Sequence, residues 1–338
     1  MPGINDIYTA KTVRKIREKA EVKRNFLINL FFPRRTTVMT EEIILECTKS
    51  GEQTAPFITP LESGRVIKNK KVRTNVITAP NIGVADVLTP KDFFTREAGM
   101  QLSGDFDPVI RASKRVGEIL RKQENYIVNK EELMVGQFLT TGKVTSLTGE
   151  DGYEVDYELD NISTLSSGEQ WGKPGVNPLT SLDEIISNAE ASGVLVGSIV
   201  MGADAAKNFM NSEHTKEILS KDLQSEFVKE VVREYPGVVW LGTYKTYGVE
   251  IFRYKRKVLG PDKKTPVEII PSNIVIGGPK DGEILYAPIV NMGKSDIHVT
   301  VRYSSVEVPT PKVKKITTES RPVLQPSDLD GYFSVIVC

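Results

Sequence analysis

The side chains that most often carry catalysis or bind metal ions are scarce in this sequence and stand far apart. Its two histidines, His214 and His298, and its two cysteines, Cys47 and Cys338, have no neighbour at the short spacings that zinc ligands use. No GxGxxG, GxxxxGK(S/T) or GxSxG motif occurs, and no Ser/His/Asp or Cys/His set stands out. We therefore expect no catalytic, cofactor-binding or metal site, and a protein that is not an enzyme.

One cluster of carboxylates is regular enough to indicate a surface. The stretches 143–147 and 153–159 alternate like two strands around a turn, which predicts a hairpin. The glycine and closing glutamate of a calcium loop are missing, so a calcium site is disfavoured. A solvated or partner-facing acidic surface is the favoured interpretation. Its members are Glu150, Asp151, Glu154, Asp156, Glu158 and Asp160.

Basic side chains gather in two stretches, although the formal net charge of the chain is zero. In the first, Thr9 to Ala20, the basic residues accompany only two apolar ones, Val13 and Ile16. Two large apolar side chains are too few to bury a helix. We therefore expect an arm that becomes ordered when a partner binds, and nucleic acid is one alternative for that partner. The basic residues of this arm are Lys11, Arg14, Lys15 and Arg17.

The second basic stretch lies within residues 50–90, where turn formers alternate with strand formers. Arg65–Lys68 and Val72–Thr78 resemble the strands of a hairpin with almost no hydrophobic face. An isolated ribbon of that kind is marginal in water, so we expect it to lie against another molecule rather than to be disordered. Its basic residues are Arg65, Lys68, Lys70, Lys71 and Arg73.

A long helix is the element that must position these surfaces. Asp107 and Pro108 suit a helix start, and apolar residues recur at helical period as far as about Phe138. Some thirty residues at ~1.5 Å rise give a rod of roughly 45 Å, whereas a compact chain of this length has a radius of gyration of about 20 Å. The helix therefore crosses the whole subunit. An ordinary long core helix is the alternative interpretation.

The second half of the chain alternates short helices and strands, which is typical of an α+β domain. Thr180 or Ser181 with Glu184 resembles a capping box that opens a helix over Leu182–Ala191. Further on we expect a buried strand at Val194–Met201 and a final strand, Phe333–Cys338, tied into a sheet. No apolar run approaches the ~20 residues that cross a bilayer. Two cysteines without a disulfide framework favour the reducing cytoplasm.

Several segments, spread nearly end to end, resemble the major capsid proteins of lambda-like tailed phages, the protein E family. Leu27–Phe32 is similar to the family's Leu-Phe-Phe block, and Thr40–Leu45 to the strand after it. The segments that carry the rest of the resemblance are Ile58–Ile67, Gly168–Trp171, Ala191–Leu195, Pro271–Gly277 and Leu324–Val335. Each motif is weak alone, but their order and coverage make the match good.

The resemblance implies the Hong Kong 97-type capsid fold and a division of the chain into parts. Residues 1–40 would be an N-terminal arm and 41–95 an extended loop. Residues 96–175 and 306–338 would form a peripheral domain around the spine helix 107–138, and 176–305 an axial domain.

The resemblance also implies a function. The chain would be the major capsid protein of a tailed bacteriophage, assembled in the bacterial cytoplasm as hexamers and pentamers of an icosahedral shell. That shell would enclose the packaged double-stranded DNA and expand during prohead maturation. Expected partners are a separate scaffolding protein, a portal and a decoration protein, with non-specific contact to DNA and no membrane. A cargo-enclosing nanocompartment shell, or another virion component, is the alternative.

The charged surfaces acquire roles within that frame. We expect the basic ribbon around Lys70 to lie over the acidic hairpin of a neighbouring subunit, through weak and salt-sensitive contacts. The basic arm would face the interior, toward scaffold or DNA.

Overall fold

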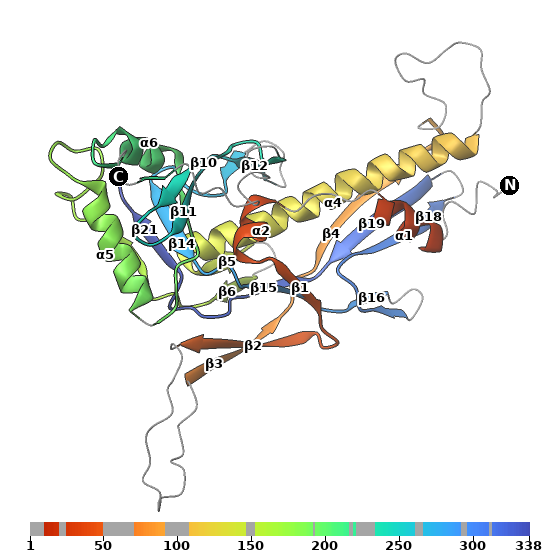
Figure 1. Ribbon diagram of the computed structural model, residues 1–338. Coiled ribbons are helices and arrows are strands. Elements are labelled where there is room, and N and C mark those ends of the chain that lie inside the picture. The colour runs from red at the N-terminus through yellow and green to blue at the C-terminus, as the bar shows by residue number, and fades with distance from the viewer. Residues whose placement is uncertain are drawn as a thin grey trace, which may run out of the picture.

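The computed structural model describes residues 10–19, 25–49, 71–91, 108–146, 153–191, 193–215, 219–220, 234–260, 266–291, 296–310 and 313–338. Helix α4 (Pro108–Thr141) runs along the elongated molecule (Figure 1). Its 34 residues make a rod of about 50 Å. It ends three residues after Phe138, and Gly142, with φ of 68°, donates its N–H to the Phe138 carbonyl. This left-handed cap explains the extra turn.

A seven-stranded sheet forms one end of the molecule. Its order is β7-β21-β14-β8-β11-β10-β9. The strands are β7 (Ile162–Thr164), β8 (Ser198–Met201), β9 (Leu219–Ser220), β10 (Val238–Tyr244), β11 (Val249–Tyr254), β14 (Ile274–Gly278) and β21 (Phe333–Ile336). Helices α5 (Pro178–Glu190) and α6 (Ala203–Asn211) pack with it in one hydrophobic cluster. The expected buried strand is present as β8, which begins at Ser198 rather than at Val194.

The final strand lies in this sheet, so assigning it to the peripheral domain was wrong. Strand β21 pairs antiparallel with β14 and parallel with β7. Phe333 and Val335 join the cluster of α5 and α6, while the Ser334 hydroxyl donates to the Thr140 carbonyl of α4. Both faces of β21 are covered, as is typical of a strand inside a sheet. Its neighbour β14 could not be identified from the order of residues in the chain.

The start of α5 also differs from the expectation. Asn177 is the N-cap, accepting a hydrogen bond from the Leu179 N–H at 3.1 Å, and Pro178 is the first helical residue. Ser181 lies inside the helix, where its hydroxyl donates to the Pro178 carbonyl. An Asn-Pro start outcompetes the expected capping box because it satisfies a first-turn amide and needs no proline N–H.

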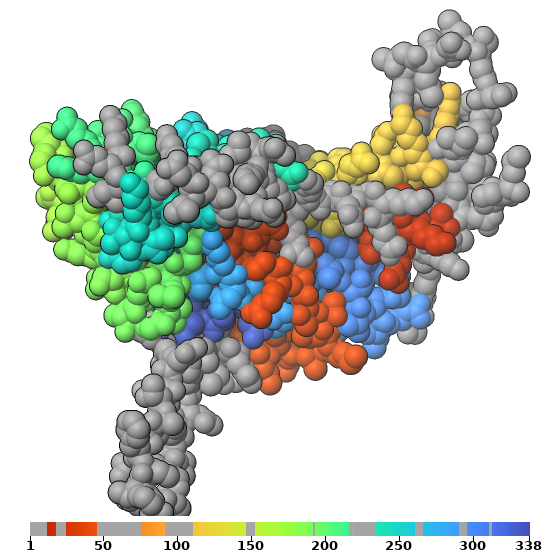
Figure 2. All heavy atoms as spheres, in the orientation of Figure 1, coloured from red at the N-terminus to blue at the C-terminus, as the bar shows by residue number. Residues whose placement is uncertain are grey.

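The middle of the molecule brings the two ends of the chain together. Helix α2 (Phe26–Phe31) leads into a sheet of order β1-β15-β20, made of β1 (Arg34–Thr37), β15 (Glu283–Tyr286) and β20 (Pro322–Gln325). Figure 2 shows the orange N-terminal atoms directly beside the blue C-terminal ones. Phe138 of α4 packs against Phe32, Tyr157 and Tyr332 at ring-centroid distances of 5.6, 5.0 and 5.2 Å. This aromatic group joins α4 to the main core.

Gly136 shows how closely α4 approaches that core. A Cβ at this position would lie 2.7 Å from the backbone oxygen of Ile269 and 2.6 Å from its Cγ2. Only a residue without a side chain fits there, so glycine is required near the C-terminal end of α4 despite its low helix propensity.

The opposite half of α4 lies on a sheet of order β18-β19-β4, made of β18 (Tyr303–Thr310), β19 (Val313–Ser320) and β4 (Ile82–Leu88). Helix α1 (Ala10–Lys19) packs beside it, and Val13, fully buried, joins a cluster with Val116 of α4 and Ile316 of β19. The expectation that only a partner could order this arm was therefore wrong. Two apolar residues suffice because α4 and the sheet supply the rest of the cluster.

Four two-stranded ribbons complete the fold. Strands β2 (Glu42–Lys49) and β3 (Lys71–Thr78) form the ribbon that projects from the body (Figure 1). The other ribbons pair β5 (Lys143–Thr145) with β6 (Glu154–Asp156), β12 (Lys257–Leu259) with β13 (Pro266–Glu268), and β16 (Ile289–Asn291) with β17 (Asp296–His298). No described helix is long and apolar enough to span a membrane.

The projecting ribbon has a hydrophobic face, contrary to the expectation for residues 50–90. Strand β3 pairs with β2 over the whole of 71–78. Ile43, Leu45 and Ile77 are buried in the main core, whereas Ile44 and Val76 on the other face are 56% and 61% exposed. The period-two alternation places one set inward. The sequence interpretation missed this face because it did not pair β3 with the segment before residue 50.

Candidate functional site

The basic ribbon residues lie only partly within the described structure. Lys71 and Arg73 belong to β3, opposite Lys49 and Cys47 of β2. Arg65, Lys68 and Lys70 lie outside the described residues, as do the side chains of Lys71 and Arg73. Their role as a contact surface stays a prediction.

The acidic hairpin has a cation of its own that the sequence interpretation overlooked. Lys143 of β5 lies opposite Asp156 of β6, and its Nζ is 2.7 Å from Asp156 Oδ2 and 3.7 Å from Glu154 Oε1. The hydrogen bond that Lys143 donates to Asp156 raises the pKa of Lys143. Glu158 is exposed, and Glu150 and Asp151 lie outside the described residues. The register of the hairpin thus neutralises part of the acidic surface within the subunit.

The basic side chains of the arm divide between two environments. Arg14 and Lys15 are exposed on α1, and the side chain of Lys11 lies outside the described residues. Arg17 instead donates from Nη1 to the Arg302 carbonyl at 2.5 Å. One of the four predicted arm residues therefore helps to hold α1 on the subunit.

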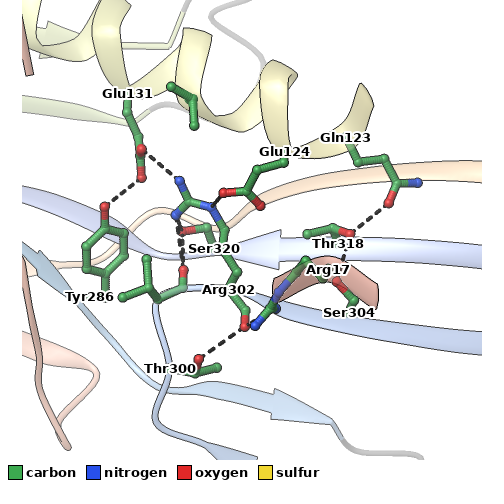
Figure 3. Close-up of polar contacts among 12 residues, drawn as sticks. Arg17, Gln123, Glu124, Glu131, Tyr286, Thr300, Arg302, Ser304, Thr318 and Ser320 are labelled. Carbon is green, nitrogen blue, oxygen red and sulfur yellow. Dashed lines mark hydrogen bonds and ion pairs between the residues drawn. The ribbon is translucent and has the colours of Figure 1, made fainter. Parts of the chain in front are cut away.

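Arg302 lies beneath α4, where the sequence interpretation expected no site (Figure 3). Its Nη2 lies 2.7 Å from Glu131 Oε2 and its Nε 3.1 Å from Glu124 Oε1, both carboxylates of α4. Nη1 donates to Ser320 Oγ at 2.7 Å. Burial alone lowers the pKa of Arg302, but attraction by Glu131, Tyr286 and Glu124 outweighs it and raises the pKa above its ordinary value. The guanidinium is therefore held charged in the interior.

Glu131 receives contacts from three separate parts of the chain. The Tyr286 hydroxyl of β15 donates to Glu131 Oε1 at 2.9 Å, and Arg35 Nη2 of β1 lies 3.6 Å from Oε2. Glu131 is fully buried and Arg302 is 4% exposed. A buried charge without a partner costs several kcal/mol, so this arrangement favours one seating of α4 on the strands.

Gln123 precedes Glu131 on α4 and is also fully buried (Figure 3). Its side chain forms a second set of hydrogen bonds between the helix and the sheet. Its Nε2 donates to the Ile316 carbonyl at 2.9 Å and to Asp86 Oδ2 at 3.2 Å, which joins β19 and β4. Its Oε1 accepts from Thr318 Oγ1 at 2.7 Å, and Thr318 contacts Ser304 of β18 at 3.0 Å. One amide on α4 thus fixes its position over all three strands.

Glu132 points away from Glu131, because successive helix residues are turned by about 100°. Its Oε1 accepts from the Leu27 N–H at 3.0 Å and from the Tyr254 hydroxyl at 3.1 Å, and its Oε2 accepts from the Ile28 N–H at 3.1 Å. The carboxylate therefore caps α2, whose Asn25 N-cap makes no side-chain cap bond. Adjacent acids of α4 thus bind opposite sides of the subunit.

The environment of Glu132 makes folding depend on pH. Burial raises its pKa to about 7, although the Leu27 and Ile28 amides, Arg256 and Tyr254 lower it. The folded state then holds this proton more tightly than the unfolded chain. Stability from this group is fully present below pH ~4.5 and is lost as pH rises through about 7. We expect the free energy of unfolding of the wild type, relative to Glu132→Gln, to fall by about 2–3 kcal/mol between pH 5 and pH 8.

Denaturant unfolding at several pH values measures this difference. Glu118→Gln is the control, since Glu118 is exposed on the same helix in an ion pair with Arg115. Its difference from wild type should stay constant over that range. A constant difference for Glu132→Gln as well would contradict the prediction.

The sequence contained a signal for these buried acids. Glu131 and Glu132 stand between Ile127–Val128 and Leu133–Val135, so they lie where both faces of α4 are apolar. Acids inside such a run have to be paired in the interior. The described residues contain no group of three or more potential metal ligands. The arrangement fixes a helix in place and offers no evident reactive chemistry.

Comparisons with known proteins point in one direction. The family described as "Phage major capsid protein E" matches residues 9–337. The major capsid protein of Escherichia phage lambda is 26% identical over 322 residues, covering 91% of this chain and 92% of that protein. The major capsid protein of Enterobacteria phage P21 is 23% identical over 199 residues. That match spans 58% of each protein, less than two thirds of the relative.

A solved structure supports the fold over nearly the whole chain. A prophage capsid protein from Escherichia coli CFT073 superposes with a TM-score of 0.73, at 18% identity, over 97% of this chain and 99% of that one. This likeness confirms the expected α+β architecture, the Hong Kong 97-type capsid fold.

Proposed function

This chain belongs to the phage major capsid protein E family, a family of structural capsid proteins, and from that premise we propose that it forms the head shell of a tailed phage. Copies would close into hexamers and pentamers of an icosahedral shell around the packaged double-stranded DNA. The observation that carries the proposal is the family match over residues 9–337. The elongated subunit, with α4 along its length and a projecting ribbon, supports it (Figure 1).

Ring closure explains why one subunit carries two unlike charged surfaces. In a head-to-tail contact, one patch of each copy meets a different patch of the next, and rotation closes the ring. The ribbon of β2 and β3 and the hairpin of β5 and β6 are the two patches we propose. A separate scaffolding protein, a portal and a decoration protein are the partners expected from this function.

Electron microscopy of the expressed chain, alone and with its scaffolding protein, tests the function. Shells of tailed-phage head size with hexamers and pentamers are the expected result. Small shells that enclose a cargo protein would indicate a nanocompartment instead. Material that never exceeds a small oligomer under either condition would contradict both.

The ribbon contact predicts an assembly defect without loss of folding. Changing Lys70, Lys71 and Arg73 to glutamate should reduce shell yield at least tenfold, because several weak ion pairs of about 0.2–1 kcal/mol each become repulsive. The measurement is the shell fraction in a sucrose gradient, with circular dichroism as the folding check. The control is Lys207→Glu, an exposed lysine of α6.

One acid of the hairpin is a candidate contact for that ribbon. Glu158 is an exposed acid of the same hairpin, and we propose it as one contact of the ribbon. Adding Glu158→Lys to the triple variant should therefore recover part of the shell yield. Normal shells from the triple variant itself would refute the ribbon contact.

Charge reversal tests the inward-facing arm more cleanly than truncation does. Removing residues 1–20 would also remove Val13 from a buried cluster and destabilise the subunit. Arg14→Glu with Lys15→Glu changes only exposed positions. If these residues face scaffold or DNA inside the shell, particle size or yield should change several-fold while the melting temperature stays within about 2 °C. Unchanged particles would contradict the inward-facing arm.

A further inference from the structure

The sheet formed by β18, β19 and β4 has two edges that differ in their protection. On β18, Glu307 and Pro309 interrupt the edge, and the pairing with β19 is irregular between Glu307 and Thr310. Helix α1 also packs against this strand, with Val13 beside Val306. Charges, proline, irregular pairing and a covering helix are the means by which proteins prevent further strand pairing.

Strand β4 lacks the proline and the irregular pairing of β18. It pairs with β19 in unbroken antiparallel register from Ile82 to Leu88, and no described strand lies on its other side. It contains no lysine and no proline, and its only charge, Asp86, is held by Lys122 of α4. Val87 is 55% exposed. An edge with regular pairing that no described strand covers is suited to receive another strand.

Helix α4 forms a wall along this edge. Lys122, Tyr126, Lys130 and Met134 follow each other at intervals of four, so they lie in one row on the helix. Lys122 Nζ lies 3.2 Å from Asp86 Oδ1, which places the row beside β4. Tyr126 is 45% exposed, and Lys122 Nζ lies 5.7 Å from its ring centroid. The wall offers an aromatic surface flanked by two cations.

A cavity of about 370 Å³ lies at the start of β4. It opens between the strand, the row on α4 and the hairpin of β5 and β6. Its lining includes Pro80, Ile82, Lys130, Met134, Val144 and Tyr153. The lining also contains the polar residues Asn81, Thr145 and Ser146, and Lys130 belongs both to the cavity and to the wall. One apolar side chain therefore fits the cavity while a carboxylate meets a lysine.

We propose that the free edge of β4 binds an extended segment of a second protein, different from this chain, as an added strand. Backbone hydrogen bonds to β4 supply the affinity, one apolar side chain enters the cavity, and a carboxylate of the segment faces Lys122 and Lys130. A second copy of β4 does not fit, because Leu88, which would come opposite Ile82, is buried in its own subunit. The proposal concerns the subunit itself and does not depend on shell assembly.

A synthetic peptide tests the edge on the unassembled full-length chain. The probe is acetyl-Thr-Phe-Thr-Asp-Thr-Val-Thr-amide at about 1 mM, the range of a weak single-strand contact. Hydrogen–deuterium exchange at alternate amides of 82–88 should slow about twofold when half of the chain is bound, with a saturable dose response. The same peptide with its alternate amides N-methylated cannot donate to β4 and should give no protection.

A charge exchange tests the wall. Lys130→Glu should weaken binding of the Asp peptide about fivefold and strengthen binding of a Lys-for-Asp peptide by a similar factor, while β4 exchange without peptide stays unchanged. Lack of saturable protection, or equal protection by the N-methylated peptide, would overturn the proposal. Protection of β4 in shells made from this chain alone would also overturn it, because the occupant would then be a second copy.

Discussion

Replacing Arg302 with methionine should lower the free energy of unfolding by about 3–5 kcal/mol, because it leaves the buried Glu131 without its main counter-charge. Glu131 Oε2 lies 2.7 Å from Arg302, whereas Arg35 is 3.6 Å away and less aligned. The Tyr286 hydrogen bond remains, but a neutral donor does not offset a buried carboxylate. Urea denaturation with the m-value checked measures the loss.

A double-mutant cycle separates the pair from simple loss of packing. Adding Glu131→Leu to Arg302→Met removes the stranded charge, so the double variant should be more stable than Arg302→Met alone by about 1–3 kcal/mol. Arg115→Met is the control, since Arg115 and Glu118 form an exposed pair 3.2 Å apart on the same helix. It should change stability by less than about 0.5 kcal/mol. Additive losses at Arg302 and Glu131 would refute the coupling.

Replacing Phe138 with alanine should cost about 3–5 kcal/mol, since it opens a cavity in the main core. Phe138 is fully buried and touches aromatic rings from three segments, namely Phe32, Tyr157 and Tyr332. These rings cannot collapse into the space together, because each belongs to a different element. Thermal and denaturant unfolding measure the loss, and crystallography or xenon binding would reveal the cavity.

Two further variants test whether the loss of stability comes from the buried aromatic group. Phe138→Leu keeps most of the apolar volume and should recover more than half of the loss. Tyr126→Ala lies on the same helix, but its side chain is 45% exposed, so its cost should stay within about 0.5–1 kcal/mol. If Phe138→Ala and Tyr126→Ala were equally mild, the aromatic group would not be what joins α4 to the core.

These two positions anchor different parts of one helix. Phe138 holds the C-terminal end in the main core, whereas Glu131 and Glu124 hold the middle to Arg302. Because α4 runs along each subunit, loss of either anchor should destabilise both ends of the subunit in a shell. Variants at both sites should therefore lower the temperature at which assembled particles lose their shape, besides destabilising the free chain.

Elements whose signals lie within a short stretch of residues could be predicted from the sequence. The long helix begins at Pro108, as predicted from the preference of proline for the first helical turn. Apolar residues that recur at helical period predicted its course as far as Phe138. The buried strand that ends at Met201 was also predicted from its own short segment. The family resemblance followed from the order of many weak motifs, and the match over 9–337 confirms it.

Which segments pair with each other became clear from the fold. Strand β21 lies beside β14, some sixty residues earlier in the chain, and β3 pairs with β2 across the segment 50–70. Both pairings depend on register and on which face is covered, and neither is encoded within a short window. That is why the final strand was assigned to the wrong part and the ribbon was taken to lack an apolar face.

The same reason explains the charged residues. Glu131 and Arg302 are 171 residues apart, and Gln123 and Thr318 are 195 residues apart, so their types alone could not pair them. Lys143, by contrast, neutralises Asp156 through a hairpin that the sequence did predict, yet the register was needed to see it. Sequence specified where charge lies along the chain. Folding decided which charges are satisfied inside the subunit and which remain for a partner.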